Sequence, residues 1–411
     1  MKLSPPLLFL LMWGTTTFGQ FEKSFKMQEI AADLTVGYAV IPEDINRDGK
    51  VDIVVVDSKR IVWYENPTWK VHTILSGKTA PDNVCICAHD IDGDGNNDLI
   101  LGADWKPFNT NTGGTLQWLK HPGKADNEWE VFPIGTEPTV HRVKIAHFGK
   151  DRTPHIVLAP LMGVASTKGG NWLDGRPVRI LAYPIPKKPA TDKWEPIVVS
   201  DSLNVVHNFW PTPMNGKKGD DLLCASYEGV SLVSQGNDGK WTTKRIGVGN
   251  QETPAGSRGA SEIRLGMMKN KTPFIATIEP WHGYQVVVYT PPAKDGEMWE
   301  RHVIDDHLRW GHAVNCADLD GDGGDELIIG VRDNQPRGEG NQENCGVRIY
   351  KLDFSPEKKF TFQRTIIENS GVAVEDMATI DLNQDGKPDI IAVGRATHNC
   401  RIYWNQHPLV K

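Results

Sequence analysis

The sequence has few cysteines, little excess charge of either sign and, after its first twenty residues, no long apolar run. The cysteines are not spaced like a disulfide framework, and a chain of this length does not need one to fold. We therefore predict buried thiols, with metal binding by the first two as the alternative, since these lie two residues apart on one strand. The six are Cys85, Cys87, Cys224, Cys316, Cys345 and Cys400.

The charge balance excludes one class of partner. Lys and Arg number 45 against 52 Asp and Glu, a net charge of −7. Binding to nucleic acid needs a basic face, so no nucleic-acid partner is expected. Motifs of other classes are also missing: there is no GxSxG, no GxxxxGK[ST] and no GxGxxG at a strand–helix junction. These absences argue against the usual hydrolase, phosphate-loop and dinucleotide sites.

The N-terminus has the pattern of a secretory signal. Lys2 supplies a positive charge, and Pro5 to Trp13 form an apolar stretch that is too short to span a bilayer. Small residues then allow cleavage before Gln20. We predict a signal peptide at residues 1–19 and a secreted or periplasmic protein, with a membrane anchor as the alternative. No later apolar segment is long enough to span a membrane.

An acidic turn recurs along the chain. Its clearest copy runs Asp90-Ile-Asp-Gly-Asp-Gly-Asn-Asn-Asp98, and full copies also begin at Asp44, Asp318 and Asp381. Degenerate copies lie at 147–155, 213–221 and 266–274. Each turn stands between two apolar strands, and a period of about 50 to 65 residues is typical of a repeat fold. Seven copies with four strands each predict a β-propeller.

A second pattern predicts how the ring closes. Six units end in a strand that opens on a bulky aromatic residue, from Trp69–Ile74 to Phe360–Ile366. The seventh such strand, Ser24–Ile30, stands near the N-terminus, while the last unit stops after its third strand. We predict an all-β fold, a single seven-bladed propeller over residues 20–411, whose N-terminal strand completes the last blade. We expect a monomer.

The spacing of the acidic turns suits calcium. Oxygen-bearing side chains stand at alternate positions and a glycine permits the sharp turn, as in the first part of an EF-hand loop. Here strands flank the loop, so an EF-hand is excluded, and a solvated turn without an ion is the alternative. We predict structural Ca²⁺ at Asp44, Asn46, Asp48 and Asp52; Asp90, Asp92, Asp94 and Asp98; Asp318, Asp320, Asp322 and Glu326; and Asp381, Asn383, Asp385 and Asp389.

The DxDGDGxxD turn followed by an apolar strand resembles the FG-GAP/VCBS repeat of integrin-type propellers. The resemblance covers essentially the whole chain after the signal segment. Seven repeats with histidines on inner strands also resemble the propeller domain of aldos-2-ulose dehydratase and related bacterial sugar lyases. This resemblance implies a carbon–oxygen lyase acting on sugars, whereas propellers of this broad class also serve adhesion.

One register of the repeat carries the candidate metal ligands. Six residues before each turn stand, in order, Tyr38, Val84, His141, His207, Ala260, His312 and Glu375. These positions open the innermost strands, at the end opposite the acidic turns. Converging imidazoles are ligands for a transition metal such as Zn²⁺ or Mn²⁺. We predict a channel metal at His141, His207, His312 and Glu375; histidines that bond only water and neighbours are the alternative.

The loops at the same end supply candidate catalytic and binding residues. A base would remove the α-proton of an oxidised, keto- or uronic-type sugar, and β-elimination would follow. Candidates for the base are His282, Tyr284 and Glu262. Candidate carbohydrate-binding residues are Arg142, Trp210, Arg258, Trp281, Trp310, Arg332 and Arg395.

Two rival hypotheses stay open. The first is a non-catalytic, Ca²⁺-stabilised propeller that binds a glycan or a protein. The second is glycoside hydrolysis by paired carboxylates, for which Glu262 and Glu375 are candidates.

Overall fold

A computed structural model describes residues 21, 24–214, 216, 218–252, 257–333, 344–354 and 360–408. The predicted signal peptide, residues 1–19, lies outside the described residues. The described residues form strands, turns and loops and contain no α-helix. Nothing among them is therefore a helix long and apolar enough to cross a membrane.

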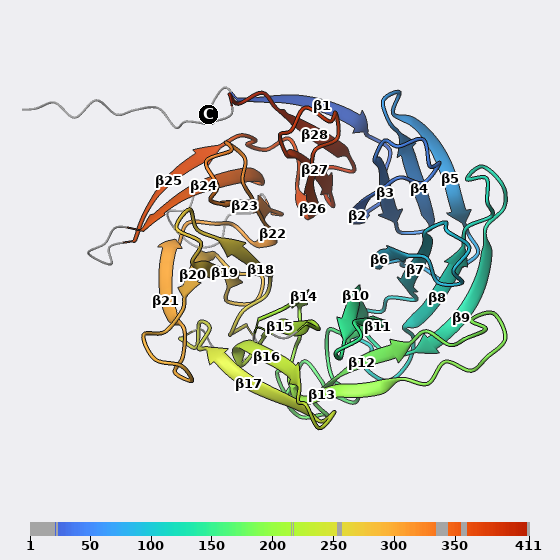
Figure 1. Ribbon diagram of the computed structural model, residues 1–411, viewed down its shortest axis with the longest axis horizontal. Coiled ribbons are helices and arrows are strands. Elements are labelled where there is room, and N and C mark those ends of the chain that lie inside the picture. The colour runs from blue at the N-terminus through green and yellow to red at the C-terminus, as the bar shows by residue number, and fades with distance from the viewer. Residues whose placement is uncertain are drawn as a thin grey trace, which may run out of the picture.

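Seven four-stranded antiparallel sheets are arranged in a ring (Figure 1), which confirms the all-β, seven-bladed propeller. Along the chain, the first three blades consist of β2 (Gly37–Glu43), β3 (Asp52–Asp57), β4 (Arg60–Glu65) and β5 (Lys70–Ser76); β6 (Cys85–His89), β7 (Asp98–Ala103), β8 (Thr115–Lys120) and β9 (Glu130–Thr136); and β10 (Val140–Phe148), β11 (Thr153–Pro160), β12 (Val178–Pro184) and β13 (Ile197–Leu203). The next three consist of β14 (Asn208–Thr212), β15 (Asp221–Ser226), β16 (Gly229–Gln235) and β17 (Trp241–Gly247); β18 (Ile263–Met267), β19 (Pro273–Glu279), β20 (Gln285–Thr290) and β21 (Glu300–Asp305); and β22 (Gly311–Ala317), β23 (Glu326–Val331), β24 (Gly346–Phe354) and β25 (Phe360–Ile366).

The last blade is built from both ends of the chain. It contains β26 (Val374–Ile380), β27 (Asp389–Gly394) and β28 (Cys400–Asn405), and its outer strand is β1 (Phe25–Ala31). The register pairs Met27 with Tyr403. The predicted closure of the ring by the N-terminal strand is confirmed, with the strand shifted by one residue from the predicted Ser24–Ile30.

The cores of the blades follow from strand alternation and aromatic residues. Every residue of β3, β7, β15, β23 and β27 is buried, because these second strands have sheet neighbours on both sides and other blades above and below. The aromatic residues of the third strands are also in the core, as expected: those at most 2% exposed include Trp63, Trp118, Tyr289, Tyr350 and Tyr403. All six cysteines are free, four of them buried and two partly buried, so the predicted thiols are confirmed.

The four full acidic turns join the first and second strands of their blades. The last acid of each turn is buried and accepts backbone N–H groups; Asp389, for example, accepts from Leu382 at 3.0 Å and from Asn405 at 2.8 Å. Asp52 and Asp98 repeat this pattern. The buried carboxylate thereby ties the turn to the end of the third strand, which explains why the motif recurs.

Two of these turns receive a lysine ammonium group from the third strand of their blade. Lys120 contacts Asp92 in the second blade, and Lys351 contacts both Asp320 and Asp322 in the sixth. In the first and last blades the lysine belongs to the turn itself: Nζ of Lys50 lies 3.6 Å from Asp48, and Nζ of Lys387 lies 3.1 Å from Asp385. Calcium in the four turns stays a prediction, and these lysines divide the turns into two kinds.

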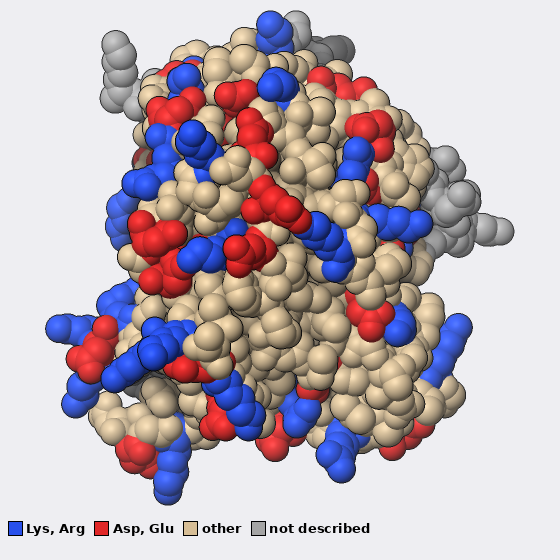
Figure 2. All heavy atoms as spheres, turned by 90° about the vertical axis from the view of Figure 1, so that its right-hand side faces the viewer, with Lys and Arg blue, Asp and Glu red and all other residues tan. Residues whose placement is uncertain are grey.

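The outer surface carries charges of both signs. Figure 2 shows basic and acidic side chains interspersed over one side of the ring, without a large basic face.

Candidate functional site

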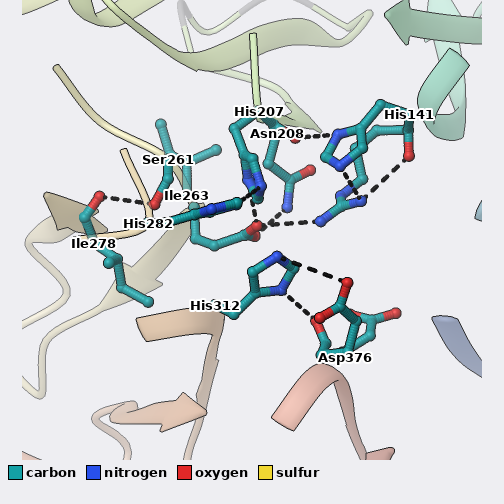
Figure 3. Close-up of polar contacts among 12 residues, drawn as sticks. His141, His207, Asn208, Ser261, Ile263, Ile278, His282, His312 and Asp376 are labelled. Atoms are coloured by element: carbon teal, nitrogen blue, oxygen red, sulfur yellow. Dashed lines mark hydrogen bonds and ion pairs between the residues drawn. The ribbon is translucent and has the colours of Figure 1, made fainter. Parts of the chain in front are cut away.

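Three of the predicted histidines lie at the same end of the inner strands. His141 is on β10, His207 directly precedes β14, and His312 is on β22. The centroid of the His207 ring lies 4.7 Å from that of His141 and 5.1 Å from that of His312. Equal register in the repeat thus brings these side chains together, and Figure 3 shows them grouped with His282.

Neighbouring oxygens determine which nitrogen of each ring carries the hydrogen. Nδ1 of His141 lies 3.0 Å from the carbonyl oxygen of His207. Nδ1 of His312 lies 2.6 Å from the carbonyl oxygen of Glu375, and Nδ1 of His207 lies 2.8 Å from Oε1 of Glu262. Because carbonyl and carboxylate oxygens only accept, each Nδ1 holds the proton and each Nε2 keeps a lone pair.

A fourth histidine, His282, completes the cluster from the loop between β19 and β20. Its Nε2 lies 2.6 Å from Nε2 of His207, and ligand nitrogens of His207, His282 and His312 all lie within 4.8 Å of one another. His141 is outside this group, because its Nε2 lies 3.1 Å from the Arg142 guanidinium, which donates to it. The structure therefore places His282, rather than His141, with the other two histidines.

Two residues of the site have backbone conformations that residues other than glycine rarely adopt. His282 has φ of 49° and Trp310 has φ of 44°, both in the left-handed region. Such conformations cost free energy and persist where the surrounding structure imposes them, which is frequent at functional sites.

Glu262 lies behind His207 and does not line the cavity described below. It is 3% exposed, contacts Nη2 of Arg142 at 3.3 Å and accepts a hydrogen bond from the Asn208 side chain. Burial opposes its ionisation, but the hydrogen bond from His207 and the charge of Arg142 outweigh burial and hold its pKa at about 2. Glu262 thus orients His207, and this geometry does not suit the predicted role of base.

Glu375 faces the opposite side of the cluster, on β26. Its Oε1 accepts a hydrogen bond from Arg395 at 2.8 Å and lies 4.0 Å from Nε2 of His312. Its Oε2 lies 3.6 Å from Arg332 and has no hydrogen-bond partner among the described residues. One carboxylate oxygen is therefore available to a bound molecule.

The four rings are neutral at pH 7. Burial lowers the pKa of His141, His207, His282 and His312, and the nearby positive charge of Arg332 lowers each further. Neutral imidazoles are suited to bind a metal. Without an ion, Nε2 of His207 and Nε2 of His282 share a hydrogen across their 2.6 Å contact, which a bound metal would replace.

A cavity of about 570 Å³, the histidine cavity, opens over this cluster. Its lining combines charged residues with apolar and aromatic ones. The charged residues are Arg142, Arg332, Glu375 and Arg395; a group of apolar residues comprises Trp105, Pro107, Phe108, Leu161 and Met162; and the remaining lining residues are Tyr38, Val84, His141, Ser257, Trp281, His282, Trp310 and His312. Small-molecule sites have volumes of roughly 300–1,000 Å³, so this cavity suits a monosaccharide-sized ligand.

Besides Glu262, three predicted catalytic or sugar-binding residues do not line the cavity. The side chain of Tyr284 is 39% exposed and does not line the cavity. Trp210 lies on β14, two residues beyond Asn208, and therefore faces a deeper part of the channel. Arg258 is also not among the lining residues. Five of the seven predicted binding residues do line the cavity: Arg142, Trp281, Trp310, Arg332 and Arg395.

The apolar lining residues of the cavity were not predicted from the sequence. Phe108, 70% exposed, stacks on Trp172 with ring centroids 5.9 Å apart. Phe108 belongs to the loop after β7, and Leu161 and Met162 follow β11. These loops vary in length between blades, so the position of a loop residue in the repeat does not predict where its side chain lies. The available signal was apolar residues in loops, which are otherwise expected to be polar.

Comparison with known proteins shows similarity to a sugar-processing enzyme and to a repeat family. A model of the aldos-2-ulose dehydratase β-propeller domain matches residues 113–292, and a model of the FG-GAP-like repeat matches residues 44–101. The chain is similar to the propeller of aldos-2-ulose dehydratase. The curated enzyme of that name from Phanerodontia chrysosporium is 27% identical over an alignment of 327 residues, and the match covers 74% of this chain and 34% of the enzyme. The chain thus spans about a third of its relative.

Solved structures show likeness of fold alone. Two crystal structures of BBS1N in complex with ARL6DN, one soaked with lead and one with mercury, match with a TM-score of 0.52 and 12% identity. The first match covers 93% of this chain and 97% of the other, and the second covers 92% and 96%.

The segment matched by the dehydratase propeller model contains His141, His207, Glu262 and His282, whereas His312 and Glu375 lie beyond it.

Proposed function

We propose that the protein is a sugar lyase that dehydrates an oxidised, keto- or uronic-type sugar by β-elimination in the histidine cavity. The observation that carries the proposal is the convergence of His207, His282 and His312, whose ligand nitrogens lie within 4.8 Å of one another; His282 and His312 line the cavity and His207 is buried behind them. The similarity to aldos-2-ulose dehydratase supports the reaction class. A binding module would not need three neutral imidazoles directed at one point.

The donor set fits a divalent transition metal. Three uncharged nitrogens, two of them with lone pairs set by oxygen partners, match the ligands that Zn²⁺ or Mn²⁺ accepts while one position stays open. His207, His282 and His312 would hold the ion, which when bound would polarise a substrate carbonyl oxygen. His141 and Glu262 support the set by holding the His207 backbone and ring.

We assign proton transfer to Glu375. Its free Oε2 accepts the α-proton, the C–H electron pair forms the enolate, and the β-carbon–oxygen bond then breaks. Glu375 returns the proton to the departing hydroxyl, which leaves as water, so the carboxylate is regenerated. Arg332 and Arg395 lie beside Glu375 and can donate to sugar oxygens.

Two groups position the substrate. Nε1 of Trp281 is buried without an acceptor among the described residues, so it can donate to a sugar oxygen. Trp105 and Phe108 offer apolar faces to the C–H face of a sugar ring.

The test combines metal analysis with turnover. The purified protein is analysed for bound transition metals and assayed on aldos-2-uloses, 3-keto-glycosides and uronic acids, with dehydrated products followed by absorbance and NMR. The variant His207→Ala is expected to lose the metal and at least about 10³-fold in kcat/KM. His155→Ala is the matched control, since His155 lies on β11 opposite Ala146, toward the acidic-turn end of its blade, and belongs to no cluster of potential metal ligands among the described residues.

Two outcomes would overturn the proposal. Full turnover by His207→Ala would exclude the assigned site. Absence of turnover on every oxidised sugar, together with saturable binding of a glycan, would favour the non-catalytic propeller.

A further inference from the structure

A second cavity lies farther along the channel, toward the acidic turns. Its volume is about 430 Å³. Residues from all the inner strands line it, but the histidines of the cluster do not. It meets the histidine cavity at Tyr38, Val84 and Arg142, which line both. We call it the basic cavity, because its lining includes Arg142, Lys144 and Arg264.

Strand alternation places these cations on one face. Lys144 stands two residues after Arg142 on β10, and Arg264 lies on β18. Trp210 on β14, between these strands, brings the two charges together: Nζ of Lys144 lies 4.9 Å from the centroid of the Trp210 ring, and the Arg264 guanidinium carbon lies 3.9 Å from it.

Most charges of the basic cavity already have partners. Arg142 contacts Glu262, and Arg264 donates to the Asn315 side chain at 3.1 Å and to its neighbour's carbonyl oxygen at 3.0 Å. Asp376 accepts the backbone N–H of Val40 at 3.0 Å.

Lys144 differs from these groups. Its ammonium forms no hydrogen bond or ion pair with any described residue, although it lies against the Trp210 ring. An ammonium group inside a channel that carries two guanidinium groups is unfavourable. The carboxylates of Asp376 and Glu262 offset this only in part, because burial and the charge of Arg264 have the larger effect on the pKa of Lys144.

We propose that the basic cavity binds a small oxyanion between the Lys144 ammonium and the Arg264 guanidinium, beside the ring of Trp210. The ligand chemistry is that of a carboxylate or phosphate, which can accept from both cations. It can come from an acidic sugar or from inorganic phosphate. The proposal does not depend on the lyase activity, because the ligand groups are separate from the histidine cluster.

The electrostatics of Lys144 agree with this assignment. Burial, followed by the charge of Arg264, lowers the pKa of Lys144 to about 8. A bound anion would stabilise the protonated amine.

The test is calorimetric titration of the whole protein with sodium phosphate and, separately, with glucuronate, each against a chloride background. We expect saturable binding of at least one anion. Lys144→Met, which keeps the length of the side chain, is expected to raise Kd at least about tenfold, because it removes a charge-assisted hydrogen bond. Lys144→Arg should retain binding. Lys193→Met is the control, since that side chain is 83% exposed.

A second measurement needs no variant. Wild-type protein is treated briefly with an amine-acylating reagent, and modification of each lysine is followed by mass spectrometry. The bound anion should protect Lys144 and leave Lys193 unprotected. Tighter binding of glucuronate than of phosphate would identify an acidic sugar as the source, and the reverse would identify inorganic phosphate. No saturable binding of either anion, or equal binding by Lys144→Met, would overturn the proposal.

Discussion

The two ends of the inner strands are built in opposite ways. At the end of the acidic turns, carboxylates are saturated by the backbone N–H groups of their own blade, as Asp389 is by Leu382 and Asn405. At the other end, polar atoms such as Trp281 Nε1 and Glu375 Oε2 are buried without partners among the described residues. Saturation gives stability, whereas available donors and acceptors allow binding. The comparison predicts that substitutions at the two ends have separable effects.

The largest expected effect is on chemistry. His312→Ala should reduce kcat/KM by about 10³-fold or more, because it removes one of the three converging nitrogens. The melting temperature should change by only a few degrees, since the ring lines a cavity rather than a blade core. Assay on an aldos-2-ulose and thermal unfolding measure the two quantities. A variant within about threefold of wild type would place the chemistry elsewhere.

The next effect is on stability. Asp389→Ala should lower the free energy of unfolding by about 3 kcal/mol or more, because it leaves two buried backbone N–H groups without a charged acceptor. Denaturant titration measures the loss, and kcat/KM at 20 °C should match wild type. Asp151→Ala, in an exposed position of a degenerate turn, should leave both unchanged. Equal stability of Asp389→Ala and wild type would contradict the structural role of the turns.

Removal of calcium should act on the same end of the molecule. A calcium-selective chelator is expected to lower the melting temperature by about 5 °C, because ions bound only by the folded state stabilise it. Turnover at 20 °C should persist, since the turns are remote from the histidine cluster. Differential scanning calorimetry with and without added Ca²⁺ measures the shift, and no shift would indicate solvated turns without ions.

The smallest effect separates the two kinds of turn. The ammonium of Lys351 contacts Asp320 and Asp322, and so competes with a cation. Saturating Ca²⁺ should raise the free energy of unfolding of Lys351→Met by more than that of wild type, and the difference should be up to about 1 kcal/mol. Lys240→Met, with an 83% exposed side chain, is the control. An unchanged response to Ca²⁺ would show that the lysine does not occupy the cation position.

The architecture could be predicted from the sequence because the repeat is regular. Counting turns and aromatic strands led to seven blades and to the pairing of the first strand with the last. The same counting placed His141, His207 and His312 at one end of the inner strands. Position in a repeat predicts position in a propeller, since each blade presents the same strand to the axis.

The composition of the cluster could not be predicted in the same way. His282 lies in a loop, where no register fixes its direction, and it reaches the cluster with a left-handed backbone. His141 has the expected position, but its neighbour Arg142 uses its Nε2. Trp210 was grouped with the mouth residues, although alternation along β14 places it in the deeper cavity. Hydrogen-bond partners and loop geometry decide such details.

Closure of the ring by β1 has a consequence for biosynthesis. Nε1 of Trp404 donates to Oε1 of Gln28, two residues 376 positions apart. β1 precedes the other strands of the propeller along the sequence, so it has no partner until β28 has left the ribosome. Until then β1 is an unpaired strand, a form prone to pair with other chains. Completion of the last blade is thus the step at which the nascent chain ceases to expose an open sheet edge.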